Sequence, residues 1–485
     1  MRATREAAAG HGEVTTRGRP VVGWAAHERA VRRLRASYDA IPPGQPIRLA
    51  KRTSNLFRPR AGTQVPGLDV SGLSGVIAID PEARTADVQG MCTYEDLVDV
   101  TLRHRLIPLV VPQLRTITLG GAVTGLGIES TSFRNGLPHE SVLEMDVLTG
   151  AGEVVTTRPG EELFEAFPNS YGSLGYTTRI RIELEPVEEY VALRHLRFED
   201  LGALTRAVET VVADRAWEGE RVDGIDGVVF EPGEAYLTLA RWTGADEVAA
   251  RGEEPEASDY TGSAVFYRSL QQRERDLLTT YDYLWRWDTD WFWCSRAFGV
   301  QHPLVRRVWP RRWRRSDVYH RLVGLENRFG VMARVDAARG KPARERVIQD
   351  VEVPVERLPD FLSWFDAQVG MRPVWLCPLR LREPEGPGSA TTWPAYPLTP
   401  GTTYVNVGFW GTVPIAEGAA DGDLNRAIEQ RVTELGGHKS LYSDAYYDRA
   451  TFDRLYNGAH HAAVKSRFDP DDRLTGLYEK AVNRR

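Results

Sequence analysis

The chain has 485 residues, with 42% hydrophobic and 26% charged side chains and a formal net charge of −6. This length suffices for two or three domains with a large buried core, and the lack of a global basic field argues against a nucleic-acid partner. The three cysteines, Cys92, Cys294 and Cys377, are far apart and form no CxxC pair. Neither a zinc site nor a disulfide framework is therefore expected, as in a reducing cytoplasm.

The sequence shows no targeting or membrane-spanning segment. No apolar run approaches the ~20 residues that cross a bilayer, and residues 1–20 are polar, without the hydrophobic core of a signal peptide. We expect a cytoplasmic protein whose residues 1–20 form a disordered tail.

Hydrophobic periodicity predicts short strands and few helices up to residue 189. Residues alternate in 178–185, where Ile180, Ile182 and Leu184 share one face. A capping-box spacing at Thr93 starts a helix. The expected strands are 47–51, 76–80, 85–89, 109–111, 142–149, 153–156 and 178–185, and the expected helices are 27–38, 94–103 and 161–167. This pattern is α+β, because a doubly wound fold would alternate strands with long helices.

A second unit is expected from residue 190 onwards, again with mixed elements. Its expected strands are 227–230, 235–239, 345–354, 373–379 and 404–410, and its expected helices lie within 201–213, 356–370, 421–435, 448–467 and 474–482. Residues 243–258 are acidic and are expected to form a mobile loop.

Four glycines fall within eight positions after an apolar run: Gly120, Gly121, Gly125 and Gly127. Glycine can take positive φ and lets a ligand approach the backbone, and exposed N–H groups in such a loop bind phosphate. We interpret this stretch as the main loop of a flavin-binding domain. A plain Gly-rich turn between strands is the alternative.

A polar, basic loop follows the expected strand 47–51. Its N–H groups together with Ser54, Asn55 and Arg58 are suited to a pyrophosphate, and a solvated basic loop is the alternative.

Several common motifs are excluded. Residues 125–130 begin like GxGxxG but lack the third glycine, and no P-loop or GxSxG element occurs. His460 and His461 are adjacent and would diverge by ~100° on a helix, so they cannot chelate one metal together.

Tryptophan and arginine alternate in the segment 281–320, which we call the Trp/Arg segment. Indole rings and guanidinium groups together suit an anionic membrane interface. An aromatic core beside a solvated basic edge is an equal alternative, and single-stranded nucleic acid is a weaker one.

The Gly motifs occur in an order that resembles the FAD-binding domain of the vanillyl-alcohol oxidase / p-cresol methylhydroxylase (PCMH) superfamily. The motifs that carry this resemblance are 54–58, 120–130, 135–136, 144–154, 172–176 and the C-terminal 465–474. Within the superfamily, 127–132, 373–378 and 441–447 are similar to the Δ24-sterol reductase group. The hydrophobic N-terminal anchor of eukaryotic members is not seen, and 113–116 departs from their acidic stretch.

The resemblance implies an α+β PCMH-type fold with two subdomains in its FAD-binding domain. It places this domain at 21–189, a substrate or cap domain at 190–440, and a helical segment at 441–485 that packs near the flavin.

The resemblance also implies non-covalent FAD, because no histidine stands in the first loop. The pyrophosphate would lie against the basic loop and the Gly-rich loop, the isoalloxazine near 130–136, and the adenine side along 175–182. The implied cofactor residues are Ser54, Asn55, Leu56, Phe57, Arg58, Pro112, Thr118, Gly120, Gly121, Thr124, Gly125, Gly127, Ile128, Glu129, Ser130, Ser132, Asn135, Gly136, Gly175 and Ile182.

The implied reaction is reduction of the side-chain Δ24 double bond of a sterol or similar lipid, with NADPH as electron donor. An unconjugated alkene needs a positioned acid. The candidates are Glu129, Tyr442, Tyr446, Tyr447 and Lys465, of which we select Glu129 and Tyr446. The alternatives are an alcohol or sugar oxidase or dehydrogenase of the same superfamily, and a lipid-binding protein without turnover.

Overall fold

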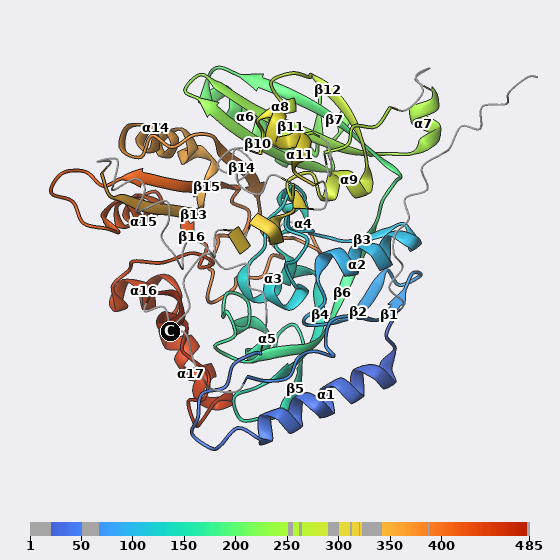
Figure 1. Ribbon diagram of the computed structural model, residues 1–485, viewed down its shortest axis with the longest axis vertical. Coiled ribbons are helices and arrows are strands. Elements are labelled where there is room, and N and C mark those ends of the chain that lie inside the picture. The colour runs from blue at the N-terminus through green and yellow to red at the C-terminus, as the bar shows by residue number, and fades with distance from the viewer. Residues whose placement is uncertain are drawn as a thin grey trace, which may run out of the picture.

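Two antiparallel sheets with helices packed on them form the computed structural model (Figure 1). The structure describes residues 21–50, 67–250, 256–260, 264–289, 300–310, 313–319, 321–322, 342–386 and 388–482. The predicted tail at 1–20, the basic loop around Ser54–Arg58 and Cys294 lie outside these residues. The predicted α+β class is confirmed.

The first sheet has six strands in the order β1-β2-β6-β4-β5, with β3 paired to β6. Its central strand β6 (Tyr176–Pro186) alternates as predicted, with Ile180, Ile182 and Leu184 buried. The other strands are β1 (Val76–Asp80), β2 (Thr85–Gln89), β3 (Leu106–Pro108), β4 (Val142–Leu148) and β5 (Val154–Thr157). The helices are α1 (Trp24–Asp39), α2 (Tyr94–Thr101), α3 (Leu119–Gly125), α4 (Ser132–Asn135) and α5 (Glu162–Ala166), with 3-10 turns η1 (Leu102–His104) and η2 (Pro138–Ser141).

Local signals located most strands and helices of this half, with two errors among the strands. Thr93 caps α2, accepting a 3.1 Å hydrogen bond from the Asp96 amide, as its spacing predicts. The strand expected at 47–51 is wrong over its described residues, where Leu49 forms only an isolated bridge to Leu68. The strand expected at 109–111 lies instead at β3, residues 106–108. Leu109 does not continue the strand because its carbonyl oxygen accepts hydrogen bonds from the side chains of Thr131 and Asn135.

The second sheet has eight strands in the order β12-β7-β11-β10-β14-β15-β13-β16. They are β7 (Tyr190–Phe198), β10 (Gly224–Glu231), β11 (Glu234–Thr243), β12 (Arg275–Thr279), β13 (Arg344–Pro354), β14 (Val374–Leu379), β15 (Tyr404–Pro414) and β16 (His438–Lys439). A small ribbon pairs β8 (Ala216–Trp217) with β9 (Glu220–Arg221). The predicted mobile loop at 243–258 is wrong in part, because it contains helix α7 (Ala245–Ala250).

The two faces of the second sheet differ in chemistry. One face is apolar and is covered by α6 (Leu201–Asp214), α14 (Leu358–Gln368) and α15 (Asp423–Glu434), which pack on Val229, Leu237, Val347, Val351, Leu376 and Val407. The other face carries Asp226, Trp375 and Asp350, since alternate residues of a strand point to opposite faces. Trp375 and Asp350 both pair with Gly408 of β15, so they lie in one row across three strands.

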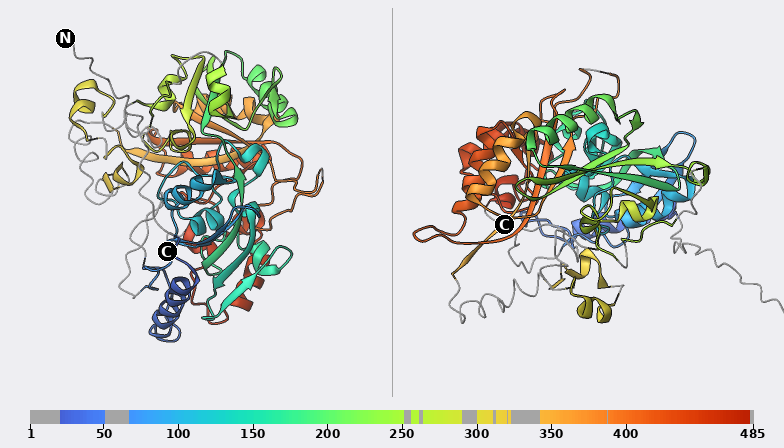
Figure 2. Two further views of the ribbon diagram at one scale, coloured as in Figure 1. Left: turned by 90° about the vertical axis from the view of Figure 1, so that its right-hand side faces the viewer. Right: turned by 90° about the horizontal axis from the view of Figure 1, so that it is seen from above.

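The polar face of the second sheet turns toward the first sheet. Trp375 packs in the same core as residues of β2, β4 and β6. The segment around α4 joins the sheets, because Ser130 O accepts from the Ile225 amide at 2.8 Å and Ser132 O from the Arg380 amide at 3.3 Å. The side view shows the blue-to-cyan half below the green-to-orange half (Figure 2). The domain boundaries drawn from the sequence stay a prediction.

The C-terminal helices return to the first sheet. They are α16 (Arg449–Leu455), α17 (Gly458–Phe468) and α18 (Leu477–Ala481), and Figure 1 shows α16 and α17 in red beside the N-terminal half. Phe468 O accepts from the Ala151 amide at 3.1 Å, and Arg473 O accepts from the Ile47 amide at 2.9 Å. These C-terminal residues thus form one wall of the half of the molecule that contains the first sheet.

The Trp/Arg segment divides into a buried and an exposed part. Trp285 and Trp287 are core residues, whereas Leu304, Val308 and Trp313 are 71%, 77% and 46% exposed. The helices described in this segment include α9 (Thr280–Leu284) and α11 (Pro303–Val308), and α8 (Phe266–Ser269) precedes them. Within the described parts of the chain, no helix combines the length and apolar character needed to cross a bilayer.

Candidate active site

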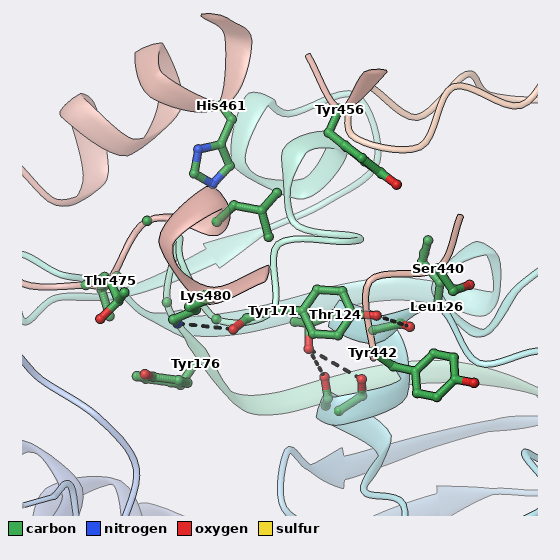
Figure 3. Close-up of a pocket in the computed structure, with 18 of the residues that line it drawn as sticks. Thr124, Leu126, Tyr171, Tyr176, Ser440, Tyr442, Tyr456, His461, Thr475 and Lys480 are labelled. Carbon is green, nitrogen blue, oxygen red and sulfur yellow. Dashed lines mark hydrogen bonds between the residues drawn. The ribbon is translucent and has the colours of Figure 1, made fainter. Parts of the chain in front are cut away.

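A cavity of about 1120 Å³ lies between the two sheets and the C-terminal helices. Typical ligand sites measure roughly 300–1,000 Å³, so this one has room for a large cofactor together with part of a substrate. Its walls come from five places: residues 46–49 with Met91, the loop and helix at 112–128, the turn at 171–177, strands β13 and β14, and the chain from 440 to 480. Figure 3 shows Tyr442 and Ser440 toward one end and Tyr176, Thr475 and Lys480 toward the other.

The Gly-rich stretch forms the first wall, but its conformation differs from the prediction. Residues 119–125 are the short helix α3 rather than a loop, because the Thr118 hydroxyl caps it by accepting from the Gly121 amide at 3.2 Å. None of its four glycines has positive φ; Leu126 does, at 56°. The expected left-handed role of these glycines is therefore wrong.

The glycines act instead through close approach. A Cβ on Gly120 would lie 2.5 Å from Thr177 Oγ1 and 2.6 Å from the Gly90 carbonyl oxygen. A Cβ on Gly127 would lie 2.8 Å from Pro112 Cγ. Gly120 therefore lets α3 pack directly on the first sheet, and Gly127 lets the chain after α3 pass close to Pro112.

Gly121 leaves part of the cavity side of α3 bare, whereas the Tyr171 ring covers Gly125. A Cβ on Gly121 would meet only Thr118 Oγ1, at 2.9 Å, within 4 Å, and Gly121 lines the cavity. Gly125 lies one helical turn further along the same face, with the Tyr171 ring 3.4 Å from its Cβ position. A ligand can therefore touch the main chain of α3 at Gly121, which fits the close packing of a dinucleotide.

The second wall is the turn from Tyr171 to Thr177. The Tyr171 hydroxyl donates to Gly125 O at 3.0 Å, its amide donates to Thr124 O at 3.2 Å, and its carbonyl accepts from Lys480 Nζ at 3.1 Å (Figure 3). Gly175 has φ of 138°, and a Cβ there would lie 2.6 Å from Leu148 O. The predicted second Gly loop thus holds α3 and the C-terminal helices together.

His461 of α17 is a buried neutral base in this wall. Its Nε2 lies 2.7 Å from Ser173 Oγ, which donates to Ser170 O at 2.6 Å. Ser173 has only one proton, so Nε2 carries the hydrogen and donates to it. Burial lowers the pKa of His461 to about 4, and the side chain acts as a fixed donor rather than as a metal ligand.

Charge at the C-terminal end of the cavity is mixed and slightly positive. The cations that line it are Arg48, Arg449, Lys465, Arg473 and Lys480. The acids at this end are Asp453, Asp472 and Glu479, and each pairs with Arg449 or Lys465. The balance suits an anionic group such as a diphosphate.

Many predicted cofactor residues meet in the cavity wall. They are Pro112, Thr118, Gly120, Gly121, Thr124, Gly125, Gly127, Ile128 and Gly175. The predicted residues Ser54, Asn55, Leu56, Phe57 and Arg58 lie outside the described part of the chain.

The remaining predicted cofactor residues do not line the cavity, because packing or hydrogen bonds hold them elsewhere. Ile182 is fully buried in β6. Ser130 Oγ bonds the Tyr283 hydroxyl at 2.8 Å, and Asn135 Nδ2 donates to Leu109 O at 2.7 Å. Ser132 Oγ accepts a hydrogen bond from the Glu129 amide. Gly136 is the C-cap residue of α4 and has a φ of 69°.

Glu129, the first predicted acid, also lies outside the cavity wall. Its Oε1 accepts from Arg286 Nη2 at 2.9 Å, and the same nitrogen donates to Asp226 Oδ2 at 2.7 Å. Burial raises the pKa of Glu129 while Arg286 opposes the rise. This cluster of Glu129, Arg286 and Asp226 joins the loop of the first sheet to β10 of the second.

Tyr446, the second predicted catalytic residue, is likewise absent from the cavity lining. Its amide donates to Glu429 Oε1 at 3.0 Å, and the Arg426 guanidinium lies 5.6 Å from its ring centroid. It packs beside α15. Tyr442, another of the candidates, does line the cavity.

Sequence reasoning missed the acid of the cavity, Asp350 on β13. It lines the cavity with Trp375, Ser440 and Tyr442, and Tyr442 hydrogen-bonds its carboxyl group. No sequence signal distinguishes Asp350, because the strand expected at 345–354 also carries polar or charged residues at 345, 346, 349 and 352. Period-two reasoning alone does not tell which face of that strand meets a cavity.

Comparison with known proteins agrees with this site. A family model described as FAD binding domain matches residues 28–158. Delta(24)-sterol reductase of Arabidopsis thaliana is 24% identical over 437 residues, covering 85% of this chain and 76% of the relative. The Homo sapiens Delta(24)-sterol reductase is 24% identical over 427 residues, covering 84% and 76%.

A second kind of relative matches a shorter region. Cytokinin dehydrogenase 6 of Oryza sativa subsp. japonica is 36% identical over 145 residues, which cover 30% of this chain and 27% of the relative. Together with the cavity between α3, the 171–177 turn and the C-terminal helices, these findings identify the chain as an FAD-dependent oxidoreductase with a PCMH-type FAD-binding domain, similar over most of its length to the Delta(24)-sterol reductases.

Proposed function

We propose that the protein reduces an isolated carbon–carbon double bond in the side chain of a sterol or similar lipid, with FAD as cofactor and NADPH as electron donor. The observation that carries the proposal is one cavity that has bare glycine backbone at one wall and apolar side chains at one end. Similarity to Delta(24)-sterol reductases over 85% of the chain supports the substrate class.

FAD would be held by main chain and by cations. The bare face of α3 at Gly121 would pack against the dinucleotide. Arg473 and Lys480, which donate to backbone carbonyl oxygens, would offset the charge of its diphosphate. The absence of a Cβ at Gly121 is the structural reason for this placement. When bound, FAD supplies hydride transfer.

The other end of the cavity fits an apolar substrate. Leu114, Ile117, Ile128 and Trp375 line it, and Leu114 belongs to a buried cluster that also contains Val300. These side chains would exclude water from an alkene while leaving few polar groups to desolvate. Specificity for a lipid would come from this apolar surface.

Two measurements on the purified protein test the proposal. Anaerobic mixing with NADPH should bleach the flavin absorbance, and mass spectrometry should detect the hydrogenated product of a Δ24-unsaturated sterol. Bleaching by an alcohol or a sugar but not by NADPH would favour an oxidase or dehydrogenase. A protein that stays colourless after incubation with FAD would favour a lipid-binding protein.

The exposed part of the Trp/Arg segment would bring a lipid substrate to the protein from a membrane surface. Leu304, Val308 and Trp313 are exposed apolar side chains next to a cluster of arginines, and such surfaces bind anionic bilayers.

Sedimentation with phosphatidylserine vesicles tests this contact. The variant Leu304→Ser/Val308→Ser and the variant Trp313→Ser should both pellet less than the wild type. Trp24→Ser, which removes an equally exposed tryptophan on α1, is the matched control and should pellet like the wild type. Equal pelleting of all four proteins would rule out the membrane role.

A further inference from the structure

An uncompensated carboxyl group sits at the apolar end of the cavity. Asp350 lines the cavity from β13, and the structure shows no salt bridge to it within the described residues. The three other acids of the cavity lining, Asp453, Asp472 and Glu479, all have a cation partner.

Several buried acids of this protein are paired with cations. Glu129 and Asp226 share Arg286, Asp288 pairs with Arg115 and Glu429 with Lys439. This is how proteins keep structural carboxylates charged in the interior. Among the described residues, Asp350 has no cation partner, and neither do the buried acids Glu345 and Glu352. Of these three acids only Asp350 lines the cavity, at the place where a substrate would lie.

The surroundings of Asp350 shape a site for an uncharged carboxyl group. Across the sheet it faces Gly408, where a Cβ would lie 2.4 Å from Asp350 Oδ1, so the missing side chain makes room for the acid. Asn406 Nδ2 lies 3.4 Å from Oδ1, and the Tyr442 hydroxyl hydrogen-bonds the carboxyl. Trp375 covers the far side of the Gly408 gap.

We propose that Asp350 is the proton donor to the alkene and that Tyr442 positions it. This deepens the proposed function and rests on it. The π bond of the alkene breaks, one carbon takes the hydride with its electron pair, and the other carbon takes the proton from Asp350. The carboxylate then regains a proton from water that enters the cavity.

The titration of Asp350 supports this role. Burial raises its pKa to about 7, against hydrogen bonds from Asn406 and Tyr442 that lower it. The titratable groups that interact with it are Tyr442, Glu352 and Cys377. Glu352 is itself held by the Tyr396 and Ser440 hydroxyls, and burial raises its pKa to about 8. An acid with a pKa near neutrality is suited to proton transfer.

Kinetics of Asp350→Asn test the assignment. We expect NADPH to bleach the flavin at the wild-type rate, while alkene reduction falls by about 10²–10⁴-fold, the usual share of a general acid. Asp350→Glu should recover part of the loss. Asp360→Asn, on α14 at the opposite face of the same sheet, is the matched control and should behave like the wild type.

Two further readouts exclude a merely structural effect. In the wild type, kcat should fall as pH rises above neutrality. In Tyr442→Phe this fall should occur at higher pH, because the variant loses a hydrogen bond that lowers the pKa of Asp350. Infrared titration of the purified protein should show protonated-carboxyl absorbance that is lost near pH 7. This absorbance should be smaller in Asp350→Asn but not absent, because burial also raises the pKa of Glu140 to about 7 and that of Glu352 to about 8.

The outcomes separate this proposal from the proposed function. A wild type that binds FAD but reduces no alkene overturns the function and the donor with it. A wild type that turns over while Asp350→Asn keeps full alkene reduction overturns the donor alone. Titrating infrared absorbance that is equal in Asp350→Asn and the wild type also overturns it.

Discussion

Replacing Gly121 by leucine should separate folding from cofactor binding. Gly121 lies in the first turn of α3 without positive φ, and its Cβ position meets only Thr118 Oγ1 within 4 Å. A leucine avoids the roughly 0.5–1 kcal/mol cost of glycine in a helix, which offsets the displaced cap. We expect the free energy of unfolding of the apoprotein to change by less than ~1 kcal/mol.

The same leucine side chain would extend into the cavity where the dinucleotide is proposed to lie. FAD affinity should fall at least tenfold, a loss of about 1.4 kcal/mol or more. Quenching of flavin fluorescence on titration with apoprotein measures the affinity, and the rise in melting temperature with FAD gives an independent readout.

Two other glycine variants serve as comparisons for the Gly121→Leu variant. Gly120→Ala places its Cβ 2.5 Å from Thr177 Oγ1 and should unfold at lower temperature. Gly202→Leu, in the first turn of α6, should leave both folding and affinity near wild type. Wild-type FAD affinity in Gly121→Leu would refute the placement of the cofactor against α3.

Three further predictions concern single groups. Arg286→Met leaves the buried Glu129 and Asp226 without a cation and should lower the free energy of unfolding in urea by about 3–5 kcal/mol. Much of this loss should be recovered when both acids are changed to amides. A loss below ~1 kcal/mol would contradict the buried cluster. Thr118→Ala removes the cap of α3 and should lower stability by about 1 kcal/mol, measured by thermal melting, whereas Thr118→Ser should not. Because the pKa of Asp350 is raised from 3.8 to about 7, the unfolded chain releases this proton first, so stability of the apoprotein should fall as pH rises from about 4 to 7; urea unfolding at several pH values should show a smaller fall in Asp350→Asn.

The strands were predictable because their signal is local. The β1–β2 hairpin and the alternation in β6 follow from residues adjacent in sequence, and the structure places them as expected. The glycines near 120 were interpreted through their conformational freedom, whereas the capping hydroxyl of Thr118 decided the local structure. A cap signal outweighed the low helix propensity of glycine.

The surroundings of the predicted acid Glu129 and of the proposed acid Asp350 could not be predicted in the same way. Glu129 is tied to Arg286, which is 157 residues away in sequence, and no local pattern reveals such a pair. Asp350 meets Tyr442 only because β13 and the chain after β16 converge on one cavity. Long-range convergence of this kind is a property of the fold and not of any short motif.

The buried cluster of Glu129, Arg286 and Asp226, which links the two sheets, affects how ligands enter and leave the cavity. Pulling the sheets apart would strand Glu129 and Asp226 away from Arg286, at a cost of about 3–5 kcal/mol. The C-terminal wall is attached partly through exposed pairs such as Arg467 with Glu162, each worth under ~1 kcal/mol. A bulky cofactor should therefore load by loosening of α16–α18, with the cleft between the sheets kept at constant width.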